Sequence, residues 1–220
     1  MRRLAIAVAL GIALWPAVGP ARPSDRALVH ATFRDFVAAL ADRDAEAGVA
    51  SLSKSSLTEW QRDRALALDG TKAEVESQPA GRRLAVYALR HHAPKFLAKE
   101  GPPEELARHA IRAGMADREG LSRIELGDVV VQGERASGQL FAAGWPSGFR
   151  AGFVREEGRW RIDLPATLDA AGRVVTQAAK ASESSEDSVI AGLLTLSSGQ
   201  RPTTRIWKPL RPARAATAAP

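Results

Sequence analysis

The sequence predicts an α+β fold, in which N-terminal helices pack on a curved four-stranded antiparallel sheet and a helical extension follows. Apolar residues recur at three- and four-residue spacing from about residue 24 to residue 115, which is typical of amphipathic helices. Between residues 121 and 164 apolar and polar residues alternate, which is typical of strands with one buried face. Helical spacing then returns. Because the helices precede a run of strands instead of alternating with them, the order favours an α+β layer.

The first 21 residues have the layout of a signal peptide. Two arginines precede an apolar run from Leu4 to Trp15, and small residues surround Pro20 after it. The run is about a dozen residues, shorter than the ~20 that a helix needs to cross a bilayer. We expect residues 1–21 to be removed during export, which leaves a periplasmic or extracellular protein with no membrane span. An uncleaved membrane anchor is the alternative.

Helical segments open the remaining chain. A helix from Ser24 to Asp44 has Ser24 or Asp25 as its cap. Residues 45–68 are predicted as two short helices with a break at 53–56. Another helix is predicted over 82–98, with an end or kink at Pro94, and a further one from Pro103 to about Met115. Residues 69–81 hold Gly70, Pro79 and Gly81 but few large apolar side chains, so they are predicted as an exposed loop.

Four strands follow, separated by turns that contain glycine. They are predicted over 124–131, 136–143, 149–153 and 160–164, with a bulge at 127–128 and a turn over 144–148 before the third strand. Asp163 lies between two apolar residues of the last strand. We therefore expect it to face away from the core and to pair with Arg150 or Arg161 across the sheet.

The remaining chain is predicted to be helical up to a flexible end. An alanine-rich helical stretch begins near residue 168, and a short apolar helix over 189–198 is ended by Gly199. The tail is rich in Ala, Pro and Arg, a composition typical of disorder. The predicted organisation is a signal peptide (1–21), an α+β domain (24–167), a C-terminal helical extension (168–210) and a disordered tail (211–220).

Composition excludes several classes of protein. The chain has no cysteine, so it forms neither a disulfide framework nor a thiolate metal site. Its 31 basic and 25 acidic residues give a charge of +6, and removal of Arg2 and Arg3 with the signal peptide leaves +4. The basic residues are scattered and aromatic content is 5%, whereas nucleic-acid binding needs a basic stripe or stacking aromatics. We expect no nucleic-acid partner.

Three segments of the chain resemble one known superfamily. The opening helix with Phe33 and Phe36 is followed by a short polar turn over 41–44, strands over 124–164 form a meander, and the last hairpin turns at Glu156-Glu157-Gly158 into a Trp-x-Ile strand. Together they resemble the nuclear transport factor 2-like superfamily, which includes ketosteroid-isomerase-like and polyketide-cyclase-like proteins. The resemblance covers about residues 25 to 165. It implies a cone in which the sheet curls around a helix and leaves an apolar pocket. Isomerases, dehydratases, cyclases, lipid carriers and protein-binding modules all use that fold, so it does not fix the function.

The enzymes of that superfamily offer a carboxylate base and a Tyr, Asp or His donor in the pocket. By this resemblance Tyr87, His92 and His109 are candidate catalytic residues. A buried core tyrosine is the alternative for Tyr87. The neighbours His91 and His92 diverge by ~100° on a helix, so they do not both face one site. No His-x-x-x-His spacing occurs, and we expect no metal and no cofactor.

Two further patterns concern binding. Trp60, Tyr87 and Trp145 are candidate ligand-binding residues, because large aromatic side chains line pocket mouths, although most tryptophans belong to a core. Glu59 and Asp63 lie four residues apart on a helix, which brings two carboxylates together and can raise the pKa of one. The arginines at positions 62 and 64 favour a solvated charged face instead.

These observations favour an exported, non-enzymatic binding module, a monomer or homodimer, whose pocket or sheet face binds a small apolar ligand or an envelope protein. One alternative is an isomerase, dehydratase or hydrolase of the ketosteroid-isomerase type. Another is a lipid carrier of the cell envelope, although the residues Pro165-Ala166-Thr167-Leu168 do not resemble those that follow the last strand of such carriers.

Overall fold

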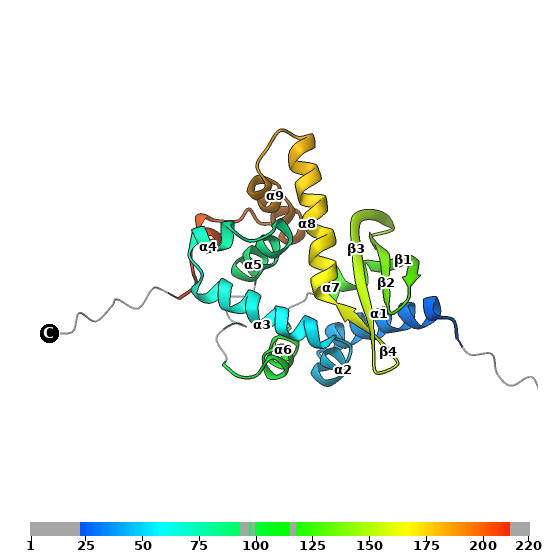
Figure 1. The fold of residues 1–220 in the computed structure, drawn as a ribbon. Coiled ribbons are helices and arrows are strands. Elements are labelled where there is room, and N and C mark those ends of the chain that lie inside the picture. Colours follow the sequence, from blue (N-terminus) through cyan, green and yellow to red (C-terminus); the bar gives the residue numbers. More distant parts are fainter. Residues whose placement is uncertain (1–22, 93–96, 98–99, 115–117, 212–220) are drawn as a thin grey trace, which may run out of the picture.

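The computed structural model describes residues 23–92, 97, 100–114 and 118–211 (Figure 1). In this part of the chain the helices before the sheet are α1 (Asp25–Asp42), α2 (Ala45–Ala50), α3 (Lys54–Asp69), α4 (Lys72–Glu76), α5 (Ala80–His92), α6 (Pro103–Arg112) and α7 (Arg118–Ser122). The strands are β1 (Ile124–Gln132), β2 (Arg135–Ala142), β3 (Trp145–Glu156) and β4 (Arg159–Asp163). The helices α8 (Leu164–Ala181) and α9 (Glu186–Ser198) and the 3-10 helix η1 (Thr204–Trp207) follow. The predicted α+β class is confirmed.

Some predicted features lie outside the described residues. These are the signal peptide, Pro94, Met115 and the tail from residue 212. Among the described residues, no helix is both long enough and apolar enough to cross a membrane.

The predicted starts of the first helices are confirmed by their caps. The Ser24 hydroxyl accepts a hydrogen bond from the Ala27 N–H (3.3 Å) and starts α1. The Ser53 hydroxyl accepts from the Ser56 N–H (3.0 Å) and starts α3, at the predicted break after α2. Serine hydroxyls satisfy the N–H groups that a helix start leaves unpaired, so local chemistry fixes both positions.

The loop predicted over 69–81 is wrong. Thr71 and Glu74 form a capping box, in which the Glu74 carboxylate accepts from the Thr71 N–H (2.7 Å), and this starts α4. Helix α5 already begins at Ala80, so Gly81 lies inside a helix. A Cβ atom at Gly81 would come within 1.9 Å of the Leu168 carbonyl oxygen, which shows that this glycine allows α5 and α8 to cross closely.

The sheet has the antiparallel order β1-β2-β3-β4. The predicted bulge is confirmed, because the β1–β2 register shifts between Leu126 and Val129. The turn predicted over 144–148 is too long, since β3 starts at Trp145 and pairs there with Ala142. A second irregularity of register, between Gln139 and Phe141, absorbs the extra residues.

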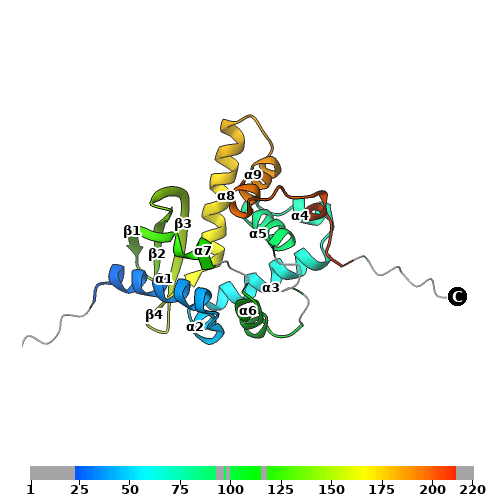
Figure 2. The ribbon, with the colours of Figure 1, turned by 180° about the vertical axis from the view of Figure 1, so that it is seen from behind.

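Helices cover both faces of the sheet. On one face Phe33 of α1 packs edge-on against Phe153 of β3, with ring centroids 6.5 Å apart. The neighbouring Gly152 points to the other face, because side chains alternate along a strand, and a Cβ there would meet Ala166 of α8. Figures 1 and 2 show α1 and α8 on opposite sides of the strands. We call α1, α7 and the four strands the sheet lobe.

Helices α2 and α6 pack with the start of α3 in a small cluster around Val49, Leu57 and Ile111. Most of the other helices form a second lobe with a separate core. Residues of α3, α4, α5, α8, α9 and η1 pack there around Tyr87, Val175 and Ile190, and we call this the helical lobe. Helix α8 joins the lobes because it continues directly from β4, so the predicted boundary at residue 168 falls inside it.

Asp163 is the residue at which strand becomes helix. Its carboxylate accepts from the Ala166 N–H (3.2 Å) and caps α8. Asp163 is only 5% exposed, and its ion pair is with Arg135 (3.9 Å). Asp163 lies on the face opposite to the core residue Ile162, as predicted, but that face is covered by α8. The predicted pairing with Arg150 or Arg161 is wrong, because the strand ends here and the side chain turns to the helix N-terminus.

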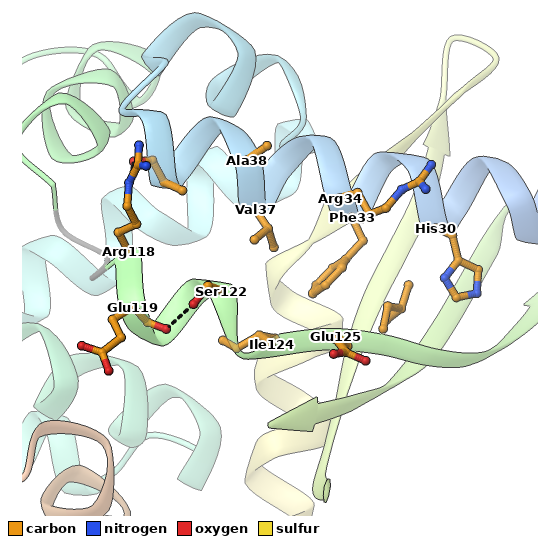
Figure 3. Close-up of a pocket in the computed structure, with 12 residues that line it drawn as sticks. His30, Phe33, Arg34, Val37, Ala38, Arg118, Glu119, Ser122, Ile124 and Glu125 are labelled. Atoms are coloured by element: carbon orange, nitrogen blue, oxygen red, sulfur yellow. Dashed lines mark hydrogen bonds between the residues drawn. The ribbon is translucent and has the colours of Figure 1, made fainter. Parts of the chain in front are cut away.

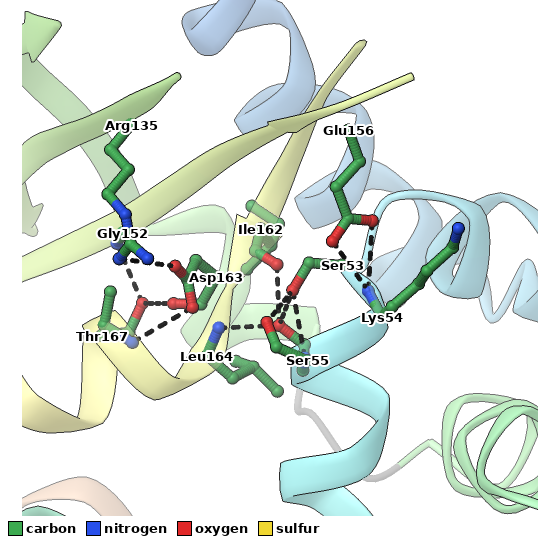
Figure 4. A network of polar contacts seen from close by, with 12 residues as sticks. Ser53, Lys54, Ser55, Arg135, Gly152, Glu156, Ile162, Asp163, Leu164 and Thr167 are labelled. Carbon is green, nitrogen blue, oxygen red and sulfur yellow. Dashed lines mark hydrogen bonds and ion pairs between the residues drawn. The ribbon is translucent and has the colours of Figure 1, made fainter. Parts of the chain in front are cut away.

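A serine network fastens α3 to this same corner (Figure 4). The Ser53 N–H donates to the Ile162 carbonyl (3.0 Å), to which the Ser56 hydroxyl also donates (2.8 Å). The Ser56 hydroxyl in turn accepts from the Leu164 N–H (2.8 Å). Both serines are fully buried, so the start of the helical lobe is tied to the last strand of the sheet lobe.

Candidate functional site

A groove of about 900 Å³ lies between α1 and the start of β1 (Figure 3). Six apolar side chains form its floor and walls: Phe33, Val37, Ala38, Ala41, Ile124 and Leu126. The α1 residues at positions 33, 37 and 41 lie four apart and therefore on one face of the helix. The residues of β1 before the bulge still pair with the end of β2, and they form the far wall. The volume is within the range of small-molecule pockets.

The charges at one end of the groove are paired with each other. Arg118 lies 2.6 Å from the Asp42 carboxylate and also donates to the Ala41 carbonyl (3.2 Å). Glu119 pairs with Arg123. The Arg118 contacts join α7 to the end of α1, whereas the Glu119–Arg123 pair is local to α7, so the charges at this end are already paired.

The other polar residues of the groove have no such partners. His30, Arg34 and Glu125 line it, and no ion pair joins any of them to the rest of the described chain. Figure 3 shows them away from the α7 end. The groove therefore combines an apolar floor with a few unpaired polar groups, an arrangement that fixes the orientation of a bound molecule.

A second cavity, of about 270 Å³, lies in the helical lobe between α3, α5 and α8. It is lined by the candidates Trp60 and His92 and by the pair Glu59 and Asp63. Sequence spacing anticipated the carboxylate pair, and the structure adds Trp60 and His92 to the same cavity.

The solvated face predicted for this part of α3 is wrong. Asp63 is 4% exposed, and Arg64 is 8% exposed and donates to the Leu97 carbonyl (2.7 Å). Burial raises the pKa of Asp63 to about 7, assisted by the charge of Glu59 and opposed by Arg82 and Arg62. The face is buried because α5 and α8 both pack against α3.

The remaining candidates lie in neither cavity. Tyr87 is fully buried in the helical core, edge-on to Trp207 at 4.6 Å, and burial raises its pKa to about 12. His109 is half-buried on α6. Trp145 is 77% exposed at the start of β3. Tyr87, His92 and His109 thus do not converge on one site.

The histidines do not form a metal centre. The His91 and His92 rings lie 4.6 Å apart, and burial and His91 lower the pKa of His92. No group of three or more His, Asp or Glu side chains in the described part of the chain is placed to hold a metal ion.

Sequence reasoning did not select the groove residues. The apolar stripe of α1 that includes Phe33 and Val37 indicates burial. That part of this stripe lines an open groove beside β1 follows only from the three-dimensional structure. His30 was the one available signal, since it lies one turn before Arg34 and Phe33 on the same helix.

Comparison of the chain with known protein families, curated proteins and solved structures gave no match.

Proposed function

We propose that this chain is an exported, non-enzymatic binding protein of the nuclear transport factor 2-like superfamily, and that it holds a small apolar molecule in the α1–β1 groove. The groove carries the proposal, because it lies between a helix and the sheet, where the resemblance places a pocket. Its floor is apolar over both elements. Removing a ligand from water against such a floor contributes about 0.8 kcal/mol for each CH₂ group that is buried.

The polar groups of the groove indicate what kind of apolar molecule fits. Arg34, His30 and Glu125 are polar groups without an ion pair in the described chain, and all three lie away from the end of the groove that holds Arg118. An amphiphile with one polar end would place that end among them and its apolar body on Phe33 and Val37. A ligand that is polar throughout would leave the floor without favourable contacts.

The separation of the candidate catalytic residues supports a binding role. A general base acts only within hydrogen-bond reach of its proton, about 2.6–3.2 Å, or through one water. Tyr87 lies in the helical core and His92 lines the other cavity. Neither contributes to the groove.

Native mass spectrometry of the chain, purified from the cells that make it, tests the proposal. We expect a bound mass that is released on denaturation. Val37→Trp, on α1, fills the groove, and this variant should lose the bound mass. Val130→Trp, on β1 at a position that is 47% exposed and does not line the groove, should keep it. Loss from both variants, or no bound mass in the parent chain, contradicts the groove as the site.

The identity of the bound mass separates the alternatives. A mass of phospholipid size would support the envelope lipid carrier. A ligand that the chain returns chemically altered would support the ketosteroid-isomerase-like enzyme instead. Recovery of another protein chain without a small molecule would contradict the proposal.

A further inference from the structure

The cavity of the helical lobe contains a buried carboxylate that lacks a hydrogen-bond donor. Asp63 is 4% exposed, and its Oδ1 atom accepts no hydrogen bond from any described residue. Arg82 Nε is 3.2 Å away, but that N–H donates to Glu59 Oε1 (2.9 Å), and a second guanidinium nitrogen of Arg82 also contacts Glu59. Arg82 is therefore closer to Glu59, and Asp63 Oδ1 has this ion pair but no well-formed hydrogen bond with a described residue.

Apart from Glu59, His92 and the Trp60 N–H, which has no hydrogen-bond partner among the described residues, the rest of the cavity lining is apolar. Ala85, Ala88 and Leu89 of α5 and Leu164 and Leu168 of α8 form its walls, together with the Trp60 ring. An indole face attracts cations as well as apolar groups. The site is thus a small apolar chamber with negative charge at one end.

We propose that this cavity binds a small apolar amine, whose ammonium group donates to Asp63 while its hydrocarbon body lies between α5 and α8. The cavity volume, about 270 Å³, suits a compact ligand. This site is distinct from the α1–β1 groove and does not depend on the function proposed for the groove.

The charges around Asp63 favour a cation over an anion or a neutral ligand. Helix α3 contributes Glu59 and the largely exposed Arg62 to the surroundings of Asp63. Helix α5 contributes Arg82 and His92, and α8 contributes two leucines. Glu59 and Asp63 share the half-buried Arg82, and the second arginine, Arg62, lies 3.8 Å from Glu59 with a side chain that is 59% exposed. The buried Asp63 therefore has the weaker compensation of the two carboxylates. An ammonium group neutralises the charge of Asp63, whereas an anion adds to it.

The deciding experiment compares two probes of equal size, hexylamine and hexanol, by isothermal titration calorimetry at pH 8. At this pH the amine is protonated and Asp63 is ionised. We expect the amine to bind at least tenfold more tightly than the alcohol. Asp63→Asn should remove that preference, so that both probes bind alike. Equal binding to the parent chain, binding of neither probe, or a preference that survives Asp63→Asn overturns the proposal.

Two controls locate the binding and protect against a variant that fails to fold. Leu168→Trp fills the cavity and should abolish amine binding, whereas Val37→Trp, which fills the groove, should not change it. In the parent chain, amine affinity should fall by up to tenfold per pH unit below pH 7, because Asp63 must lose its proton to pair with the ammonium. Hexanol affinity should stay constant, and an amine affinity that is also constant contradicts the role of Asp63.

Discussion

The two lobes bury different chemistry. The buried cluster between α1 and the sheet consists of apolar side chains, such as Phe33, Phe153 and Ile162. The helical lobe buries Asp63, Arg64 and Arg90 as well. A sheet pairs its backbone groups with the neighbouring strand, whereas a helix ends with carbonyls that have no partner in the helix. The helical lobe therefore buries donors for its helix ends, whereas the buried charge of the sheet lobe, Asp163, caps the start of α8.

Arg90 shows how the helical lobe meets this need. It is 3% exposed, and its guanidinium donates to the carbonyls of Leu66, Ala67, Gly70 and Ile206 at 2.6–3.1 Å. One side chain thus satisfies the C-terminal end of α3 and joins it to η1. The apolar cluster of the sheet lobe has no comparable side chain among the described residues.

Arg90→Leu should have the largest effect. Leu66 and Ala67 keep a backbone donor each, but the carbonyls of Gly70 and Ile206 lose the guanidinium. Buried acceptors without a partner cost about 1–3 kcal/mol each, so we expect the free energy of unfolding to fall by about 5 kcal/mol. Urea unfolding measures this. Arg90→Lys should recover only part of the loss, and full recovery by lysine would show that the charge matters and the fork of donors does not.

Asp63→Asn tests a second buried charge of the helical lobe. The folded chain keeps the Asp63 proton up to about pH 7, whereas the unfolded chain loses it near 3.8. Stability from this group is therefore complete below about pH 4 and is lost as pH rises to 7. Three pH units correspond to about 4 kcal/mol, so the asparagine variant should gain up to that amount on the parent chain between pH 4 and pH 8. Urea midpoints at both pH values measure it, and parallel pH profiles would contradict a buried, weakly compensated Asp63.

Gly81→Ala should disturb the helical lobe alone. The added methyl group meets the Leu168 carbonyl at the crossing of α5 and α8, and forced overpacking costs about 3 kcal/mol. Gly192→Ala is the matched control, because that helical glycine on α9 has nothing within 4 Å. The control should stabilise the chain by up to about 1 kcal/mol. Thermal unfolding of the two variants separates the effects, and equal shifts would argue against a close crossing.

Ser56→Ala tests the link between the lobes. The change removes the donor to Ile162 and the acceptor for the Leu164 N–H, at a cost of about 2 kcal/mol. Thr58→Ala is its control, because Thr58 is exposed and its hydroxyl donates to the Lys54 carbonyl of the same helix. Hydrogen exchange should show faster opening at the start of α8 in the Ser56 variant only. Unchanged exchange there would mean that the lobes are held together elsewhere.

Local patterns allowed the sheet lobe to be predicted well. The cap at Ser24 and the bulge after Leu126 each follow from a few neighbouring residues, and the structure confirms them. The helical lobe was less accessible, because its burial depends on contacts between distant segments. Nothing near Gly81 indicates that α8 crosses there, and nothing near Asp63 indicates that α5 and α8 cover it.

The candidate sites divide in the same way. The pairing of Glu59 with Asp63 follows from helical spacing, but the addition of Trp60 and His92 requires the packing of three helices. The size of the groove depends on the distance between α1 and the start of β1, and no residue pattern in the sequence predicts that distance.

The order of the core residues along the chain has a consequence for synthesis. The sheet lobe is complete once Asp163 has been made, since α1 and all four strands precede it. The helical core needs partners from α8, α9 and η1, and Arg90 finds its last acceptor at Ile206. During vectorial synthesis α1 and the four strands therefore emerge before the partners that cover the apolar surfaces of α3 and α5, which makes these two helices the stretch that chaperones would protect.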